Sequence, residues 1–263
     1  MEKKIKAAVI GYGNIGKYAV EAVSEAEDMI LTGVVPSRNP NKPIPHELKN
    51  VPVATGIESL IEQYGKPDVA LLCTATLDIE KNAEQILSMG INTVDSFDIH
   101  SKIFDLRMKL DSVAKKYGSA AICSAGWDPG SDSLIRALLL ACAPRGITYT
   151  NFGPGMSMGH SVAAKSIKGV KDAMSVTIPL GSSVHRRMVY VQLEDGIDLA
   201  DVESAIKNDP YFVRDDTRVI LTEDVRAIKD TGSGVNMVRK GVAGGADNQQ
   251  FAFDMRVNNP ALT

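Results

Sequence analysis

Apolar residues follow two periodicities along the first half of the chain. Short apolar runs with the length of buried strands lie at 5–10, 29–35, 68–73, 91–94 and 120–123. Between these runs, apolar residues recur every three or four positions, as on one face of a helix, over 14–25, 79–89 and 103–117. Alternating strands and helices favour a parallel sheet, and its right-handed crossovers predict the Rossmann topology.

The second half of the chain has the alternating pattern of half-buried strands. Residues 189–194 and 251–258 alternate apolar with polar side chains, which is typical of an antiparallel sheet with one buried face. A helix expected over 199–208 interrupts these strands. We therefore predict an α/β protein with a Rossmann dinucleotide-binding domain over 1–147 and an α+β domain over 148–263.

Two stretches depart from these patterns. Residues 36–52 contain five prolines and are expected to form a surface loop. At the end of the chain, Asn259 and Pro260 have the residue types of a helix start, because Asn caps helices and Pro suits the first helical position. The sequence stops three residues later. This pattern predicts either a chain truncated before a C-terminal helix or a tail without fixed structure.

Composition narrows the class of protein. The 263 residues carry a net charge of −3, which disfavours a nucleic-acid surface because such a surface needs clustered excess Lys and Arg. No apolar run reaches the ~18 residues of a membrane span, and the first apolar segment is too short for a signal peptide. The three cysteines lack Cys-x-x-Cys spacing, and we expect reduced thiols in a cytoplasmic protein. No residues have the spacing of metal ligands, so no metal is expected.

A glycine-rich motif follows the first predicted strand and opens the first predicted helix. It is the G-x-G-x-x-G sequence Gly11, Tyr12, Gly13, Asn14, Ile15 and Gly16. In this context the motif predicts a dinucleotide site, with the pyrophosphate at the helix N-terminus. The alternative is a glycine turn without a ligand. We assign the residues after the later strands to the same cofactor site, namely Cys73, Thr74, Ala75 and Asp95.

The end of the second predicted strand indicates which nicotinamide cofactor binds. NAD enzymes usually have an acidic residue there, which holds the ribose 2′-hydroxyl. In this chain the strand is followed by Pro36, Ser37 and Arg38, with Lys42 nearby. A hydroxyl and a guanidinium suit a 2′-phosphate, so NADP is expected. The alternative is a solvated basic loop, but the missing acid disfavours NAD in either case.

Three long motifs follow strand ends, where open α/β sheets bind ligands. They are Thr-Val-Asp-Ser-Phe-Asp at 93–98, Ser-Ala-Gly-Trp-Asp-Pro-Gly at 124–130, and Asn-Phe-Gly-Pro-Gly-Met-Ser-Met-Gly-His-Ser at 151–161. With Asn-Asn-Pro at 258–260, the chain resembles the meso-diaminopimelate dehydrogenase family over its whole length. The resemblance implies NADP-dependent oxidative deamination of the D-centre of meso-2,6-diaminopimelate to L-2-amino-6-oxopimelate and ammonium. It also implies a homodimer, a second domain for substrate and dimerisation, and a place in lysine and peptidoglycan precursor synthesis.

The resemblance also implies a set of substrate-contacting residues. Asp98 and Asp128 match the family's substrate carboxylates and are our candidates for catalysis. The other implied substrate contacts are Trp127, Phe152, Met158, Gly159, Thr177, Arg187 and Asn259. One departure is Ser233, which stands where family members often have His and puts one carboxylate contact in doubt. A second departure is the missing helix after Asn259, with which family members continue.

The residues themselves agree in part with these roles. Arg187 shares the buried parity of Val189 and Val191, so it is predicted either to bind an anion or to form a structural ion pair. Asp98 could instead cap the helix after it, and Asp128 could be a turn residue. His100 and His160 lie in the motif loops, where each could move protons or be structural.

Other functions remain open from the sequence alone. The runner-up is another two-domain Rossmann reductase, such as a dihydrodipicolinate reductase or a homoserine dehydrogenase. A different class is a catalytically silent NADP-sensing module. The presence of Asp98 and Arg187 disfavours the silent module.

Overall fold

The chain forms two compact units in the computed structural model, which describes residues 3–36, 43–228, 231–242 and 248–258. The units divide between Ser133 and Leu134, near the start of helix α5 (Ser131–Cys142). The sequence placed the domain boundary after residue 147, which lies inside strand β6 (Arg145–Phe152). The difference arises because the change in periodicity marks where the later strands begin, and the periodicity did not predict α5.

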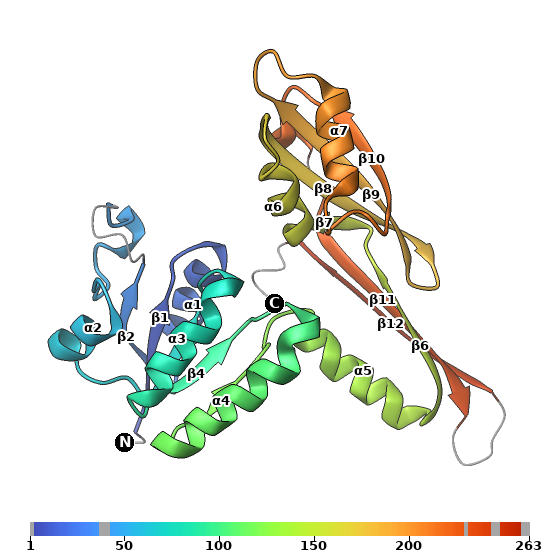
Figure 1. Cartoon of the computed structure of the whole chain (residues 1–263). Helices are drawn as coiled ribbons and strands as arrows, with labels where there is room; N and C mark the ends of the chain where they lie inside the picture. The colour runs from blue at the N-terminus through green and yellow to red at the C-terminus, as the bar shows by residue number, and fades with distance from the viewer. Residues whose placement is uncertain (1–2, 37–42, 229–230, 243–247, 259–263) are drawn as a thin grey trace. The chain divides into compact units, whose positions relative to one another are not determined.

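The first unit is built on a five-stranded parallel sheet in the order β2-β1-β3-β4-β5 (Figure 1). The strands are β1 (Ile5–Ile10), β2 (Met29–Val35), β3 (Val69–Leu72), β4 (Asn92–Asp95) and β5 (Ala121–Ile122). The predicted Rossmann-like architecture is confirmed. Strand β1 pairs with both β2 and β3, so the strand order reverses beside it. Open α/β sheets bind ligands at such a point, beyond the carboxyl ends of the strands.

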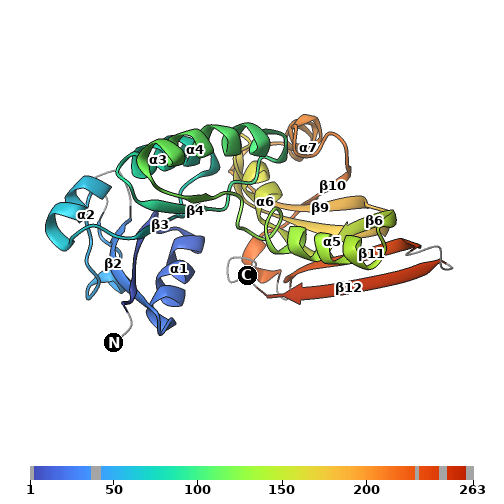
Figure 2. The same ribbon diagram turned by 90° about the horizontal axis from the view of Figure 1, so that it is seen from below.

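Helices cover both faces of this sheet (Figure 2). They are α1 (Asn14–Glu25), α2 (Ile57–Tyr64), α3 (Thr76–Ser88) and α4 (Ile103–Tyr117), with short 3-10 turns at His46–Leu48 and His100–Lys102. Ala8 and Ile10 of β1 face the core made with α2, α3 and α4, and Val9 faces the α1 side. The proline-rich stretch was predicted as a surface loop, but Leu48 within it is buried in the core on the α1 side.

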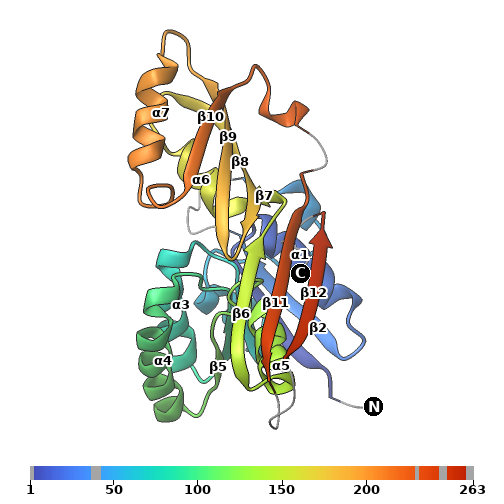
Figure 3. The ribbon, with the colours of Figure 1, turned by 90° about the vertical axis from the view of Figure 1, so that its right-hand side faces the viewer.

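The second unit contains two sheets (Figure 3). Strands β6, β11 (Ser233–Val242) and β12 (Gln249–Val257) form an antiparallel sheet in the order β12-β11-β6. The other sheet, in the order β10-β9-β8-β7, comprises β7 (Gly155–Ser157), β8 (Val170–Gly181), β9 (Val184–Leu193) and β10 (Asp216–Leu221). Helices α6 (Met158–Lys165) and α7 (Leu199–Asn208) pack on it, and a 3-10 turn lies at Val225–Ala227.

The predicted burial pattern of β9 is confirmed, but the strand direction is only partly as expected. Val189 and Val191 are fully buried, and Arg187 shares their face. Strand β9 is antiparallel to β8 and parallel to β10, whereas the alternation predicted an antiparallel sheet. The reason is α7, which connects β9 to β10, because a crossover helix returns the chain in the same direction.

Helix α5 covers one face of the three-stranded sheet of the second unit. Arg239 of β11 is buried there and donates hydrogen bonds to the carbonyl oxygens of Ala143 and Pro144 at the end of α5. The Arg136 side chain of α5 donates to the Thr150 hydroxyl of β6. Within the described ranges, none of the helices is long and apolar enough to cross a membrane.

Candidate active site

The glycine motif packs the start of α1 tightly against the sheet. Gly11 has a φ of +97°, and a Cβ at this position would lie 2.4 Å from the carbonyl oxygen of Cys73. A Cβ at Gly16 would lie 2.1 Å from the carbonyl oxygen of Gly11. A Cβ at Gly13 would meet no atom within 4 Å among the described residues. Two glycines therefore permit close packing, and the third leaves open space at the helix N-terminus.

A pocket of about 600 Å³ opens beside this motif in the first unit. Six residues that the sequence assigned to the cofactor line it, namely Gly11, Tyr12, Gly13, Cys73, Thr74 and Ala75. The first turn of α1 contains no acidic residue, and in the described part of the chain no side chain caps it. The N–H groups at the start of α1 are therefore available to a phosphate. These features fit a dinucleotide.

The pocket also has polar residues that the sequence did not single out. Asn82 is 2% exposed, and its side-chain amide donates to the Thr74 hydroxyl at 3.1 Å. Gln85 lines the same wall and donates to Glu58 at the start of α2. Asn82 shares the buried face of α3 with Ile79 and Ile86, so a polar residue in the apolar phase of a predicted helix was the available signal. Glu58 had no such signal because α2 was not predicted.

The remaining predicted cofactor residues lie in different places. Asn14 and Ile15 begin α1, and Ser37 and Arg38 lie outside the described residues. Asp95 is 3% exposed and is absent from the described lining of the pocket. Burial raises the pKa of its carboxyl group, against hydrogen bonds from two backbone N–H groups. The assignment of these residues to the cofactor stays a prediction.

The candidate carboxylates lie in the loops that follow β4 and β5. Asp98 accepts a hydrogen bond from the Thr76 hydroxyl at 2.7 Å, so it lies beside the start of α3. It is not the cap of α4, because Lys102 occupies that position. A carboxylate oxygen of Asp128 lies 4.0 Å from Nε2 of His100, which joins the two loops. Both loops leave the carboxyl edge of the sheet that carries the pocket.

Trp127 lies in the second of these loops. Its indole N–H is buried and has no hydrogen-bond partner among the described residues. The backbone of Gly126 donates to the Pro129 carbonyl, which closes a tight turn around Trp127 and Asp128. A Cβ on Gly126 would lie 3.3 Å from Cβ of Ser96, so this turn packs directly on the loop after β4.

In the second unit, Thr177 and Arg187 are opposite each other on β8 and β9. Arg187 is 9% exposed, and its guanidinium donates to the Thr177 hydroxyl and, from Nε, to Asp215 at 2.6 Å. The structural ion pair considered from the sequence is therefore present. It does not use the whole guanidinium, because the described contacts leave Nη2 without a partner. The N–H groups of Nη2 could therefore donate to a carboxylate.

His160 is held neutral beside this ion pair. Its Nε2 lies 2.9 Å from the Tyr211 carbonyl, which can only accept, so Nε2 carries the proton. Its Nδ1 then accepts from the Ser157 hydroxyl at 2.9 Å. Burial, followed by the nearby Arg187 charge, lowers the pKa of His160 to about 4. Both ring nitrogens are engaged, so the geometry favours a structural role over proton transfer.

The Phe-Gly-Pro-Gly motif lies between the two sheets of the second unit. The Phe152 backbone N–H donates to the His185 ring at 2.9 Å, and the two rings are 5.7 Å apart. Gly153 has a φ of +96°, and a Cβ there would lie 2.3 Å from the carbonyl oxygen of Thr177. The motif thus brings Phe152 close to the strand that carries Thr177.

The last predicted substrate residues are partly described. Met158 and Gly159 begin α6, and Asn259 lies outside the described residues. Ser233 is 2% exposed and donates its hydroxyl to the Met156 carbonyl at 2.7 Å. Its hydroxyl is therefore engaged with the backbone. No cluster of three or more His, Cys, Asp or Glu that could hold a metal occurs in the part of the chain that the structure describes.

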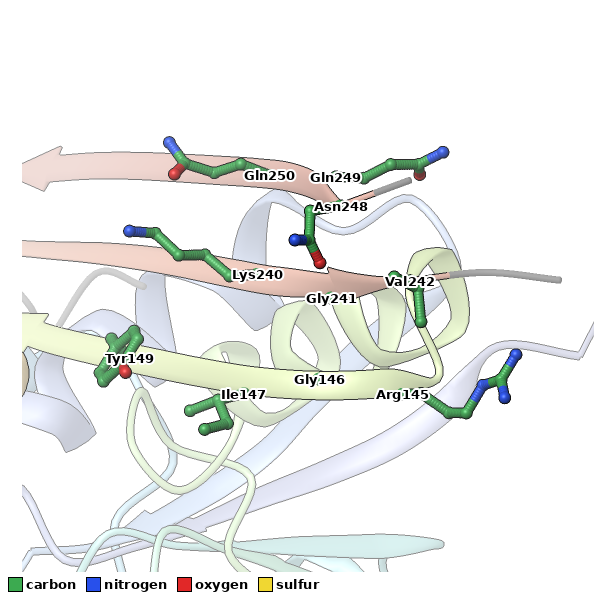
Figure 4. Close-up of a pocket in the computed structure, with 10 residues that line it drawn as sticks. All are labelled: Arg145, Gly146, Ile147, Tyr149, Lys240, Gly241, Val242, Asn248, Gln249 and Gln250. Carbon is green, nitrogen blue, oxygen red and sulfur yellow. The ribbon is translucent and has the colours of Figure 1, made fainter. Parts of the chain in front are cut away.

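A second hollow, of about 590 Å³, lies on the three-stranded sheet, on the face away from α5 (Figure 4). Its lining includes Arg145, Tyr149, Lys240 and Gln250, and no residue that the sequence assigned to substrate or cofactor. The cationic groups of Arg145 and Lys240 point away from each other. The described side chains therefore present no converging polar groups that would hold a small ligand.

Comparison with known proteins gives concordant results. Residues 126–184 match the family described as the diaminopimelic acid dehydrogenase C-terminal domain. The chain is 56% identical over 262 residues to a meso-diaminopimelate D-dehydrogenase of Bacteroides fragilis. That alignment covers 99% of this chain and 86% of the relative.

Two solved structures are similar over nearly the whole chain. The diaminopimelate dehydrogenase of Corynebacterium glutamicum in complex with DAP has a TM-score of 0.86 at 26% identity, covering 99% of this chain and 85% of that one. An engineered D-amino acid dehydrogenase bound to NADP+ has a TM-score of 0.81 at 26% identity, with the same coverage. Both similarities extend through the two units rather than the Rossmann unit alone.

Proposed function

Because this chain belongs to the meso-diaminopimelate D-dehydrogenase family, we propose that it reversibly deaminates the D-centre of meso-2,6-diaminopimelate with NADP. The products are L-2-amino-6-oxopimelate and ammonium. The structural observation that carries the proposal is one sheet edge that bears both the dinucleotide-type pocket and the loops of Asp98 and Asp128. Family membership disfavours the dihydrodipicolinate reductase, homoserine dehydrogenase and silent-module alternatives.

The cofactor assigned to the pocket is NADP rather than NAD. The open helix N-terminus beside Gly13 would hold the pyrophosphate. The absence of an acidic residue directly after β2 in the sequence, together with Ser37 and Arg38, favours a 2′-phosphate over a free 2′-hydroxyl. The engineered relative bound to NADP+ supports the same choice.

The substrate carries two ammonium and two carboxylate groups, and the candidate residues match both kinds. Asp98 and Asp128 would accept hydrogen bonds from ammonium groups. Arg187, with the hydroxyl of Thr177 beside it, would bind a carboxylate through Nη2. Asp215 then orients the guanidinium and partly neutralises its charge while the site is empty.

The reaction requires that the reacting ammonium group of the substrate lose a proton, and one of the two carboxylates would assist. A nicotinamide bound in the pocket would accept the hydride from the D-centre carbon, and water would then hydrolyse the resulting substrate imine to the oxo product and ammonium. The reacting amine must be neutral when the hydride leaves, so its ammonium group must first lose a proton. We assign Asp98 to this ammonium, where it would position the group and relay its proton to water, and Asp128 to a second contact. The Thr76 hydroxyl on the Asp98 carboxylate fixes its orientation.

Substitution of the two aspartates tests this assignment. Asp98→Asn removes the proton acceptor and should cut steady-state NADPH production from meso-diaminopimelate by at least ~10²-fold, with NADP binding retained. Asp111→Asn is a matched control, because Asp111 lies on the surface of α4 and pairs only with Lys115 among the described residues. Near-normal turnover for both Asp98→Asn and Asp128→Asn would refute the mechanism.

We further infer that the protein is a cytoplasmic homodimer acting in lysine and peptidoglycan precursor synthesis. The second unit exposes apolar side chains on two surfaces, at Leu134 and Leu138 of α5 and at Ile147 of β6, each at least 60% exposed. A second copy would cover such patches, which isolated subunits rarely expose. The described cysteines are free thiols, in keeping with a reducing compartment.

A further inference from the structure

One buried carboxylate joins the two loops that carry the candidate catalytic aspartates. Asp95 is the last residue of β4, and a single oxygen, Oδ1, accepts hydrogen bonds from two backbone N–H groups. One is the N–H of Phe97 at 3.0 Å, in the loop that leads to Asp98. The other is the N–H of Ser124 at 2.9 Å, in the loop that leads to Asp128.

Further contacts hold the same junction. The Asp95 carbonyl oxygen accepts from the N–H of Ala125 at 2.7 Å, so Asp95 binds two consecutive residues of the second loop. Ser124 has a φ of +59°, a conformation that non-glycine residues rarely adopt unless their surroundings impose it. The N–H of this same residue, Ser124, donates the hydrogen bond to Asp95. Asp95 therefore fixes the point at which the second loop leaves the sheet.

We propose that Asp95 is a positioning residue, whose carboxylate sets the relative placement of the Asp98 loop and the Asp128 loop. The proposal deepens the proposed function and rests on it, because Asp98 and Asp128 are taken as the substrate carboxylates. It also differs from the role that the sequence gave to Asp95, which was cofactor binding.

The environment of Asp95 opposes a negative charge on its carboxyl group. The side chain is 3% exposed, and its second oxygen, Oδ2, is buried without a hydrogen-bond partner among the described residues. Burial raises the pKa of this carboxyl group, so the fold favours the protonated form. Charged acceptors, however, bind N–H groups more strongly than amides do, which suits a residue that must fix two loops.

The single tryptophan of the chain reports on this junction without any activity measurement. Trp127 lies three residues after Ser124, and its indole N–H is buried. Its emission maximum and its quenching by acrylamide therefore follow the placement of the second loop. This readout separates the inference from the proposed function, since a chain without activity on meso-diaminopimelate would still show it.

Asp95→Ala should release both loops. We expect a red-shifted Trp127 emission, stronger quenching, and a kcat with meso-diaminopimelate lowered by about 10- to 100-fold, the size that small misplacement of catalytic groups produces. The Kd for NADP should stay within about twofold. Asp68→Asn is the matched control, because Asp68 also accepts a hydrogen bond from a backbone N–H, that of Lys6. Asp68 directly precedes β3, so it lies at the amino-terminal end of the parallel strands, away from the two loops.

Asp95→Asn keeps the shape and one acceptor oxygen, and it covers the case in which Asp95→Ala does not fold. We expect a lower kcat per folded enzyme together with an unchanged Kd for NADP, a combination that a purely structural residue would not give. A lower Tm with unchanged kcat per folded enzyme would overturn the proposal, as would unchanged fluorescence and kcat in both variants. A loss confined to NADP affinity would assign Asp95 to the cofactor instead.

Discussion

At the scale of single residues, the least obvious assignment is that of Arg187. Its ion pair with Asp215 satisfies a buried charge, and an ion pair alone would explain why an arginine occupies a buried strand position. Nη2 has no contact among the described residues and favours a second role, because its N–H groups can donate to a carboxylate.

Arg187→Met separates the two roles, since it keeps the bulk of the side chain and removes its charge. If Arg187 binds substrate, the KM for meso-diaminopimelate should rise by about one to two decades, the equivalent of a charge-assisted hydrogen bond of about 1.5–3 kcal/mol. The Kd for NADP should not change. Arg186→Met is the matched control, because Arg186 pairs with Asp216 on the more exposed face of the same strand.

Arg187→Met can also contradict the proposed role in substrate binding. Removing Arg187 leaves the Asp215 carboxylate without its strongest described partner, so some loss of stability is expected in either role. A protein that folds with unchanged KM would identify Arg187 as a structural residue.

At the scale of elements, local periodicity was sufficient for part of the fold. The predicted β1, α1, β2, α4 and α7 have the bounds that the structure shows, because each buries its own regular apolar face. Helix α5 was not predicted, since its leucines include exposed residues such as Leu134 and Leu138 and its run of apolar residues has no single buried face. The parallel pairing of β9 with β10 depends on α7 returning the chain, which no strand pattern encodes.

The candidate site, too, could be predicted only in part from the sequence. The glycine turn could be predicted because its conformation depends on the spacing of glycines within one short segment. The contacts of Asn82 with Thr74 and of Arg187 with Asp215 could not, because they join residues that only packing brings together. Asp95 was placed at the cofactor by its position after a strand, and only the hydrogen bonds of Oδ1 revealed the two loops it joins.

The free energy of unfolding should depend on pH through His160, which joins α6 to the loop after α7. In the folded protein its pKa is lowered to about 4, whereas an unfolded histidine has a pKa of about 6.5. Above pH 6.5, His160 is neutral in both the folded and the unfolded chain, so it does not lower the free energy of unfolding. As the pH falls from about 6.5 towards 4, the unfolded chain binds a proton that the folded chain does not, so stability is lost.

Comparison with His160→Gln isolates this effect, because the remaining titrating groups, including His185, are common to both proteins. Between pH 7.5 and pH 5, the native protein should lose about 2 kcal/mol more unfolding free energy than the variant. Denaturant unfolding at the two pH values measures it. Equal losses in both proteins would show that His160 titrates normally in the fold.

At the scale of the whole molecule, each of the two units carries charged groups of its own kind. The first unit has the dinucleotide-type pocket and the anionic loops, and the second has a buried guanidinium whose Nη2 has no contact among the described residues. The anionic loops suit ammonium groups and the guanidinium suits a carboxylate, so each unit by itself matches one kind of charge of an amino-acid substrate. The similarity to diaminopimelate dehydrogenases through both units supports the same substrate class.

The central claim is the D-centre of meso-2,6-diaminopimelate as the site of oxidation, and stereoisomer discrimination tests it most directly. The measurement is initial NADPH formation, with ammonium release quantified in the same samples, for the meso and the L,L isomers at equal concentration. We predict one ammonium per NADPH with the meso isomer and no reaction with the L,L isomer, with NADP but not NAD as the efficient acceptor. Oxidation of the L,L isomer, or no reaction with the meso isomer by the folded, NADP-binding protein, would contradict the account.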